Sequence, residues 1–349
     1  MEALKRAVIR VAATPDGRLQ ELPFLQRSLL LPLLSFASSL FRLSLALRRR
    51  LYRFGLLPRH RLPVPVISVG NLTWGGNGKT PMVEFIARIC VEAGIPPLIL
   101  TRGYASGDEA KMLERHLSGT SARIGVGANR TAVAASIFER HGYMKFENTL
   151  YSKKLSNPHE FGSASENGKV GVAILDDGMQ HWSMLCDVEI VMLNGLMPWG
   201  NNHLIPRGSL REPLGALSRA DIIVVHHADL VSDGQLKVIK SKMHTVDACH
   251  AIGPLLVDRL DFGDHHSIQL NDIEMIKERL GKLKDRFNTE VVAVVTEKDY
   301  DRDALILREI HNFDVLVLCS SFQIMPSYGQ GEDTFRRKLK ELIISKFGG

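Results

Sequence analysis

The stretch GNLTWGGNGKTPMVE, from Gly70 to Glu84, ends its glycine-rich run in Gly-Lys-Thr. A phosphate-binding loop has a glycine, any four residues, and then Gly-Lys-Ser/Thr. Thr73 stands where that pattern has its first glycine. The run VPVISV (64–69) predicts a strand before the loop, and the pattern of 79–94 predicts a helix after it. This order aims backbone N–H groups and a helix N-terminus at an anion, so we interpret the stretch as a nucleotide site with a variant entrance.

Each residue of the predicted cradle has a role in this interpretation. The glycines let the backbone approach phosphate oxygens, the lysine meets the β- and γ-phosphates, and the threonine ligates Mg²⁺. The alternative is an ordinary glycine-rich connection. The predicted nucleotide-binding residues are Gly75, Gly76, Asn77, Gly78, Lys79 and Thr80.

Short apolar runs alternate with helical patterns along the rest of the chain. Each run holds several β-branched residues and is bounded by Gly, Pro, Asp or Asn. Continuous apolar strands that alternate with helices predict a layered α/β/α fold of the P-loop type, with a mostly parallel sheet. Ligands then bind at the carboxyl ends of the strands. The predicted strands are 64–69, 97–100, 170–175, 188–193, 221–225, 290–295 and 314–319.

The positive charge is concentrated at the start of the chain. Residues 1–61 contain twelve Lys/Arg and three Asp/Glu, so they carry +9, whereas the whole 349-residue chain carries +6. The rest is therefore net negative and lacks the basic stripe that nucleic-acid binding needs. Residues 28–47 are mostly apolar and are followed by three arginines. We expect a helix in a membrane interface, with arginines reaching for anionic head groups; the alternative is a core-facing helix.

Two other features of the N-terminal segment bear on the cellular compartment of the protein. The basic run follows the apolar run, and no cleavage site is evident, which argues against a secretory signal. The first thirty residues bear arginines and are poor in acid, as in mitochondrial presequences.

Acidic residues follow one of the predicted strands. In ILDDGMQHW (174–182), Asp176 and Asp177 come at the strand's carboxyl end, opposite the phosphate loop. Carboxylates in that place bind Mg²⁺ directly or through water, although a solvated Asp-Gly turn is the alternative. In GDEA, Asp108 is either a helix N-cap or a general base that accepts a hydroxyl proton.

Two more stretches carry candidate site residues. FGDHHSI (262–268) offers His265, next to an acid and a second histidine, to hold and tune such a base. PRGSLREPL (206–214) supplies Arg207, Arg211 and Glu212 in a loop bracketed by prolines. Arginines there suit a phosphate-rich substrate, and a surface ion pair is the alternative.

Taken together, these stretches resemble the tetraacyldisaccharide 4′-kinase family, the lipid A kinases. The likeness rests on PVPVISVGNLTWGGNGKTP, LTRGYASGDE, ILDDGMQHW, IVMLNGLMPWGNNHLIPRGSLREPL, FGDHH and VVTEKD, which occur in the family's order from about Pro63 to Arg302. The family's loop usually lacks the first glycine. The likeness is strongest to plant-type members, which favours a membrane-associated mitochondrial location over the cytoplasmic face of a bacterial inner membrane.

The resemblance implies ATP- and Mg²⁺-dependent transfer of a γ-phosphoryl group to a sugar hydroxyl of a membrane-held acylated disaccharide phosphate. It implies Asp108 as catalytic base supported by His265, with Asp176 and Arg211 also catalytic. Thr80, Asp177 and Glu212 are the implied metal ligands. It also implies a membrane-associated N-terminal helix and two α/β lobes that close over ATP.

The expected organisation has three parts. Residues 1–62 form the membrane segment, residues 63–228 the kinase lobe with a polar loop insertion at 141–169, and residues 229–349 a second lobe. The family usually has a longer stretch between the HHADL segment and FGDHH than residues 240–260 provide here. Two alternatives to an active kinase therefore stay open: a nucleotide-gated membrane-surface binding protein, and a shortened, catalytically impaired form.

Overall fold

A computed structural model of the chain describes most of its residues. The described residues are 2–14, 16–75, 77–103, 108–156, 168–227, 268–287, 291–302, 304–311, 313–318, 324 and 331–347. The predicted site residues Gly76 and His265 lie outside this set, as does the shortened stretch at 240–260.

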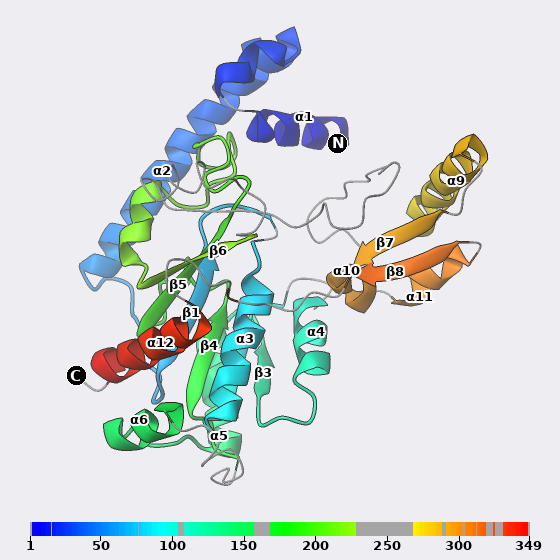
Figure 1. The fold of residues 1–349 in the computed structure, drawn as a ribbon. Helices are drawn as coiled ribbons and strands as arrows, with labels where there is room; N and C mark the ends of the chain where they lie inside the picture. Colours follow the sequence, from blue (N-terminus) through cyan, green and yellow to red (C-terminus); the bar gives the residue numbers. More distant parts are fainter. Residues whose placement is uncertain are drawn as a thin grey trace.

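Figure 1 shows how the elements are arranged along the chain. The strands are β1 (Val66–Asn71), β2 (Pro97–Thr101), β3 (Arg123–Val126), β4 (Val172–Asp176), β5 (Val188–Asn194), β6 (Ile222–His226), β7 (Val292–Thr296) and β8 (Asp314–Leu318). The α-helices are α1 (Glu2–Ala13), α2 (Leu31–Arg53), α3 (Lys79–Glu92), α4 (Asp108–His116), α5 (Arg130–His141), α6 (Asn148–Ser156), α9 (Leu270–Phe287), α10 (Glu297–Arg302), α11 (Ala304–Leu307) and α12 (Glu332–Phe347). Short 3₁₀ or π turns cover η1 (Asp16–Glu21), η2 (Gln26–Leu30), η3 (Leu214–Arg219) and η4 (Arg308–Ile310).

Six parallel strands form the main sheet, in the order β3-β2-β4-β1-β5-β6. Alternate residues of each strand pack on opposite faces. Ile67 and Val69 of β1 join one core with α3 and α12, and Val66 joins the other with α5. The chain therefore forms the predicted α/β/α layers, because a parallel sheet needs apolar cover on both faces.

All seven predicted strands are present, with ends that differ by one or two residues. The short edge strand β3 was not predicted, since RIGV carries little apolar signal. The interpretation of 141–169 as an aperiodic loop is wrong over α6. There Tyr151 is buried and donates to Gly171 O at 2.6 Å, and Lys154 donates to Gly94 O at 2.9 Å. Tertiary burial holds this helix despite its polar sequence.

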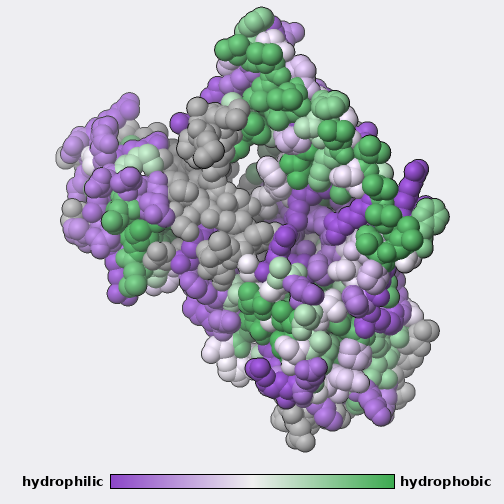
Figure 2. Space-filling view, turned by 180° about the vertical axis from the view of Figure 1, so that it is seen from behind, coloured by the Kyte–Doolittle hydropathy of each residue, from purple (hydrophilic) through white to green (hydrophobic). Residues whose placement is uncertain are grey.

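The N-terminal segment forms a helical arm beside the carboxyl ends of the strands (Figure 1). Gln26–Arg53 is long and apolar enough to cross a membrane. One stripe of the arm is exposed, and it shows as green along the arm in Figure 2. Its residues recur every three or four positions, as one face of a helix requires. The stripe consists of Leu25, Leu29, Leu33, Phe36, Leu40, Leu43 and Leu47, each more than half exposed.

The opposite side of the arm is attached to the body. Ser38 is buried; its hydroxyl donates to Leu204 O at 2.8 Å and accepts from Arg207 N at 3.0 Å. Phe41 and Leu45 pack on the core beside β5. The helix therefore has two apolar sides, one that faces solvent and one that the body covers.

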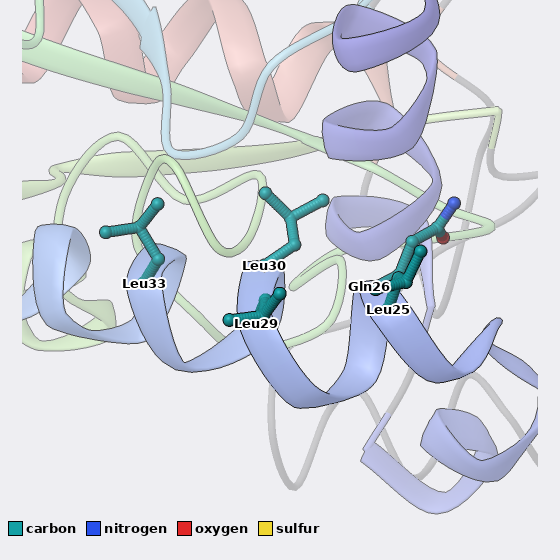
Figure 3. A pocket seen from close by; sticks show the side chains of 5 residues that line it. All are labelled: Leu25, Gln26, Leu29, Leu30 and Leu33. Carbon is teal, nitrogen blue, oxygen red and sulfur yellow. The ribbon is translucent and has the colours of Figure 1, made fainter.

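A shallow apolar groove runs along the start of the arm. It is lined by Leu25, Gln26, Leu29, Leu30 and Leu33, and has a volume of about 600 Å³. Figure 3 shows these side chains on successive turns, beside α1. The groove continues the exposed apolar stripe rather than forming an enclosed ligand cavity.

A second, two-stranded parallel sheet pairs β7 with β8 and packs with α9 and α11 around Ile273 and Ile310. This smaller α/β unit contacts the main body through α10 and α4. Arg115 of α4 holds Asp301 of α10 at 3.0 and 2.8 Å. The predicted second lobe, 229–349, differs from the structure at its end, because α12 returns to pack on the main sheet.

Candidate active site

The phosphate loop leaves β1 and enters α3, as predicted. Thr73, at the variant position, is buried, and its Oγ1 accepts from Asn77 Nδ2 at 3.3 Å. Thr73 also forms an antiparallel bridge with Leu210. The backbone of this residue is therefore held by pairing and not by a tight turn that would need glycine, which explains why threonine is tolerated there.

Glycine is required at the other end of the loop. Gly78 has φ 70° and forms the N-cap of α3. A Cβ there would lie 2.7 Å from the His226 ring, at the end of β6. The helix begins with Lys79 and Thr80 and has no side-chain cap. Its first-turn N–H groups and helix dipole are thus directed at the place where an anion would bind.

Asp176 is the last residue of β4, and Asp177 begins the turn at the end of β1. Asp177 adopts φ 53°, a conformation that Asp tolerates better than most residues. Gly178 comes next, and its N–H donates to Val69 O at 3.1 Å. A side chain at Gly178 would meet the Ser68 hydroxyl at 2.3 Å. The small residue lets this turn lie against β1, which brings both carboxylates beside the phosphate loop.

Asp177 contacts two predicted site residues. Arg211 binds it with both terminal nitrogens, at 2.7 and 2.8 Å, and Lys79 Nζ lies 3.7 Å from Asp177 Oδ1. Burial alone would raise the pKa of Asp177, but these hydrogen bonds and charges lower it to about 2. Asp177 is therefore ionised at neutral pH and orients the cations that would meet a phosphate.

Arg211 is itself positioned by the phosphate loop. Its N–H donates to Leu72 O at 2.6 Å, and Nη1 donates to Asn71 Oδ1 at 3.1 Å. The loop with bracketing prolines thus docks on the strand end that carries the phosphate loop. Sequence reasoning missed Asn71, which the quoted stretch contains two residues before the variant threonine.

Asp176 is more deeply buried than Asp177. Burial raises its pKa to about 6, although the charge of Lys79 opposes the shift. Its Oδ1 has no hydrogen-bond partner among the described residues. Buried Arg130 donates to Asp176 O at 2.6 Å and so fixes the backbone. Sequence reasoning missed Arg130; the only signal was an arginine directly after the helix N-cap Asn129.

Glu212, one of the predicted metal ligands, binds an arginine in this structure. Glu212 is buried, and both its oxygens accept from Arg219, at 2.8 and 3.1 Å. Trp182 Nε1 also donates to it at 3.4 Å. In this structure these contacts make Glu212 tie two loops together, and its role as a metal ligand stays a prediction.

The predicted general base lies at a helix start. Asp108 is the first residue of α4, which follows β2 at the carboxyl edge of the sheet. The structure describes its backbone and not its side chain. His265 is outside the described residues, so the pairing of the two stays a prediction.

The carboxylates fit a Mg²⁺ ion better than a metal held by the protein alone. The described residues contain no cluster of three or more His, Cys, Asp or Glu that would form a complete metal cage. Mg²⁺ usually binds one or two carboxylates together with water and substrate phosphates. Asp176 Oδ1, which is buried and has no hydrogen-bond partner among the described residues, has the chemistry of such a ligand.

A family model described as "Tetraacyldisaccharide-1-P 4'-kinase" matches residues 30–107 and 105–251. A relative from Arabidopsis thaliana, "Probable tetraacyldisaccharide 4'-kinase, mitochondrial", is 45% identical over 396 aligned positions that cover 99% of each chain. The chain belongs to the tetraacyldisaccharide 4′-kinase family. A Halothermothrix orenii member, "Tetraacyldisaccharide 4'-kinase", is 35% identical over 60% of this chain and 53% of its own length.

Family membership agrees with the motifs that carry the site. The matched residues include the phosphate loop, the Asp176–Asp177 turn and Arg211. Among solved structures, LpxK from Aquifex aeolicus in complex with ATP aligns with a TM-score of 0.46 and 20% identity, over 91% of this chain and 100% of that chain. The 396 positions aligned with the Arabidopsis kinase exceed the 349 residues here, so that family member contains residues with no counterpart in this chain.

Proposed function

We propose that this protein transfers the γ-phosphoryl group of ATP to the 4′-hydroxyl of a tetraacyldisaccharide 1-phosphate, a step of lipid A biosynthesis. The observation that carries the proposal is the convergence of Lys79, Asp177 and Arg211 at the start of α3 in a chain of this family. Phosphoryl transfer asks mainly for positioning and for neutralisation of charge, and these three residues provide both.

In the proposed reaction one bond forms and one bond breaks at the γ-phosphorus. The acceptor hydroxyl oxygen forms a bond to the γ-phosphorus, and the bond from that phosphorus to the β,γ-bridging oxygen breaks, so ADP leaves. Asp108 takes the hydroxyl proton as general base, with His265 as its support. Lys79 and the amides of the phosphate loop bind the phosphates, and Arg211 faces the transferred group.

Mg²⁺ fits as the metal cofactor. We assign Asp176 and Thr80 as its protein ligands, with Asp177 alongside, because Asp176 offers a buried oxygen without a donor. When bound, the ion neutralises charge on the β- and γ-phosphates. Asp177 keeps Lys79 and Arg211 oriented toward the same phosphates.

The arm explains how the enzyme would reach a lipid acceptor. Its exposed apolar stripe would enter the interface of a membrane, while its buried side stays attached to the body at Ser38. A membrane-held substrate would then meet the active site without leaving the bilayer. We place the protein in mitochondria, as the name of the Arabidopsis relative suggests for that protein. Co-purification of a tagged chain with cytosol instead of mitochondrial membranes would exclude this location.

One assay tests the proposed activity. Purified protein in neutral detergent micelles is given γ-labelled Mg-ATP and the acylated disaccharide 1-phosphate. We expect label in the lipid, almost none with Lys79→Ala, and a loss of turnover with Asp108→Asn. Lys111→Ala is the matched control, since this lysine is exposed and donates to Arg302 O of α10 at 3.4 Å. Turnover by Asp108→Asn at the wild-type rate would remove the base assignment, and unlabelled lipid with the wild type would reject the activity.

The difference in length from the Arabidopsis relative favours a second candidate, a catalytically impaired form. In that case calorimetry would register Mg-ATP binding while the labelled lipid fails to appear. Insertion of the relative's additional residues would then restore turnover. Partner capture that depends on nucleotide, without any lipid phosphorylation, would instead indicate a nucleotide-gated binding protein.

A further inference from the structure

An arginine cluster lies where the arm joins the body. The rings of Tyr52 and Trp182 stack with centroids 6.1 Å apart. The guanidinium of Arg59 lies 5.5 Å from one ring and 5.6 Å from the other. Arg48 lies 5.9 Å from Tyr52, and Arg49 lies 5.9 Å from Trp182. Arg219 of η3 lies 4.5 Å from Trp182 as well. The two aromatic rings therefore hold four arginines together, one from the loop after the arm, two from its last turns and one from η3.

The charges in this cluster do not balance. Glu212 is the carboxylate that the described residues place against it, and Arg219 occupies both of its oxygens. Arg49 only approaches Glu212, at 4.0 Å. Within the described part of the chain, Arg48 and Arg59 have no carboxylate within ion-pair distance, and both are exposed. The cluster therefore has spare positive charge that is open to solvent.

The loop after β4 carries both Trp182 of the cluster and Asp177 of the predicted active site. Trp182 follows Asp177 by five residues, a separation of at most about 18 Å even for an extended chain. A turn shortens it, because His181 N donates to Gly178 O at 2.7 Å. The pKa of His181, which is in this loop, is lowered to about 4, chiefly by burial. The positive charges of Arg130 and Arg48 contribute to this lowering, so the positive potential of the arginines extends into the loop. Trp182 and Asp177 therefore belong to one short loop.

The exposed apolar stripe of the arm, which we propose enters the membrane, ends at this cluster. The exposed apolar stripe of the arm stops at Leu47, directly before Arg48. In Figure 2 hydrophilic residues (purple) flank the region where the green arm joins the body. If the stripe enters the acyl region, these arginines lie at the level of the head groups. That is the level at which the phosphate of a membrane-held sugar would be found.

We propose that Arg48, Arg49 and Arg59 around the Tyr52–Trp182 stack form a phosphate-binding subsite for the acceptor, at the end remote from the hydroxyl that is phosphorylated. The proposal rests on the proposed function, and the family description itself names an acceptor with a 1-phosphate. Arginine forks bind phosphate through paired, charge-assisted hydrogen bonds. The stacked rings hold the arginines in place, so little side-chain freedom is lost when phosphate binds.

The test compares two acceptors, the disaccharide 1-phosphate and the same molecule without that phosphate, in neutral detergent. For Arg59→Gln and Arg48→Gln we expect KM for the phosphorylated acceptor to rise about 10-fold or more, since each loses a charged hydrogen-bond donor. KM for the dephosphorylated acceptor and kcat should stay within about 2-fold. Arg50→Gln is the matched control, because it removes the same charge from an exposed neighbouring position of α2.

Three outcomes would overturn the subsite. An equal rise of KM for both acceptors, or a lowered melting temperature, would mean that the arginines only hold the arm to the body. If the wild type has the same KM for both acceptors, the subsite is excluded, whereas the proposed kinase activity is not. An effect of the variants that appears only on vesicles with anionic phospholipid would assign the cluster to lipid head groups.

A binding measurement separates this subsite from the proposed reaction. Calorimetry with each acceptor in micelles, without ATP, needs no turnover. Tighter binding of the phosphorylated acceptor to the wild type, lost in Arg59→Gln and kept in Arg50→Gln, supports the subsite even if no lipid is phosphorylated. Equal binding of both acceptors by the wild type contradicts it.

Discussion

Arg211 binds Asp177 through both terminal nitrogens, at 2.7 Å from Nη1 to Oδ1 and 2.8 Å from Nη2 to Oδ2. The two residues are 34 positions apart in sequence. Lys79 lies 3.7 Å from the same carboxylate, so one acid orients two cations next to the start of α3. The pair connects the loop after β4 with the loop before η3, and it is the centre of the proposed active site.

Arg211→Lys should reduce kcat by about 100-fold or more, because lysine cannot make the forked contact with a carboxylate or phosphate. Steady-state phosphorylation kinetics measure the effect. Arg207→Lys is the control: Arg207 is in the same loop but pairs with exposed Asp16 at 2.8 Å, and its replacement should leave kcat unchanged. Equal losses in the two variants would argue against a role for the fork.

Glu212→Gln tests whether this residue is structural or a metal ligand. We expect a loss of about 3–5 kcal/mol in the free energy of unfolding, since Arg219 would keep its charge with no buried partner. Urea unfolding measures it. Asp16→Asn, at an exposed ion pair, should cost less than about 1 kcal/mol. A weaker dependence on Mg²⁺ with unchanged stability would instead favour the metal-ligand role.

Thr73→Gly restores the standard loop pattern, and we expect it to weaken ATP binding by a few-fold. The change removes the hydroxyl that accepts from Asn77 and frees the backbone that pairs with Leu210. Thr73→Ser keeps the hydroxyl and should bind ATP nearly as well as the wild type. Calorimetry with Mg-ATP compares the three proteins; tighter binding by Thr73→Gly would show that threonine is only a tolerated defect.

Gly78→Ala should abolish nucleotide binding, because φ is 70° and the new Cβ would meet His226. In Gly78→Ala/His226→Ala the steric contact is removed while the backbone strain remains. We therefore expect partial recovery of ATP affinity in the double variant. Full affinity in the single variant would mean that the loop has another conformation when it binds nucleotide.

Stability should fall as pH rises through the titration of Glu189. This residue accepts from the Ser68 hydroxyl at 2.7 Å, and burial raises its pKa from 4.5 to about 7. Its protonated form is therefore favoured in the folded protein. That contribution is complete below pH 4.5 and is lost as pH rises toward 7 and beyond. Glu189→Gln cannot ionise, so its melting temperature relative to wild type should increase across this range. A constant difference would contradict the assignment.

The sheet was predictable because its strands are continuous apolar runs, a signal that survives without any tertiary information. The phosphate loop was predictable because Gly78, Lys79 and Thr80 are adjacent. Arg130 and Trp182 could not be found in that way. Their roles depend on contacts with Asp176 O and Glu212 that only the fold creates. The contact of Glu212 with Arg219, seven positions along the chain, is created by the fold in the same way.

The arm illustrates a second limit of sequence reasoning. An apolar helix was evident from its composition, but a helical wheel cannot say which face the body covers. Ser38 is buried because Leu204 O and Arg207 N satisfy its hydroxyl, while the more apolar Leu40 stays exposed. Tertiary hydrogen bonds decided the orientation.

The most direct measurement is ³¹P NMR of the lipid recovered after incubation of the purified wild-type protein with Mg-ATP and the acylated disaccharide 1-phosphate. We expect a new phosphomonoester resonance coupled to the 4′ proton of the acceptor, which is absent with Lys79→Ala. ADP release with an unchanged lipid spectrum, or the same resonance from Lys79→Ala, would contradict it.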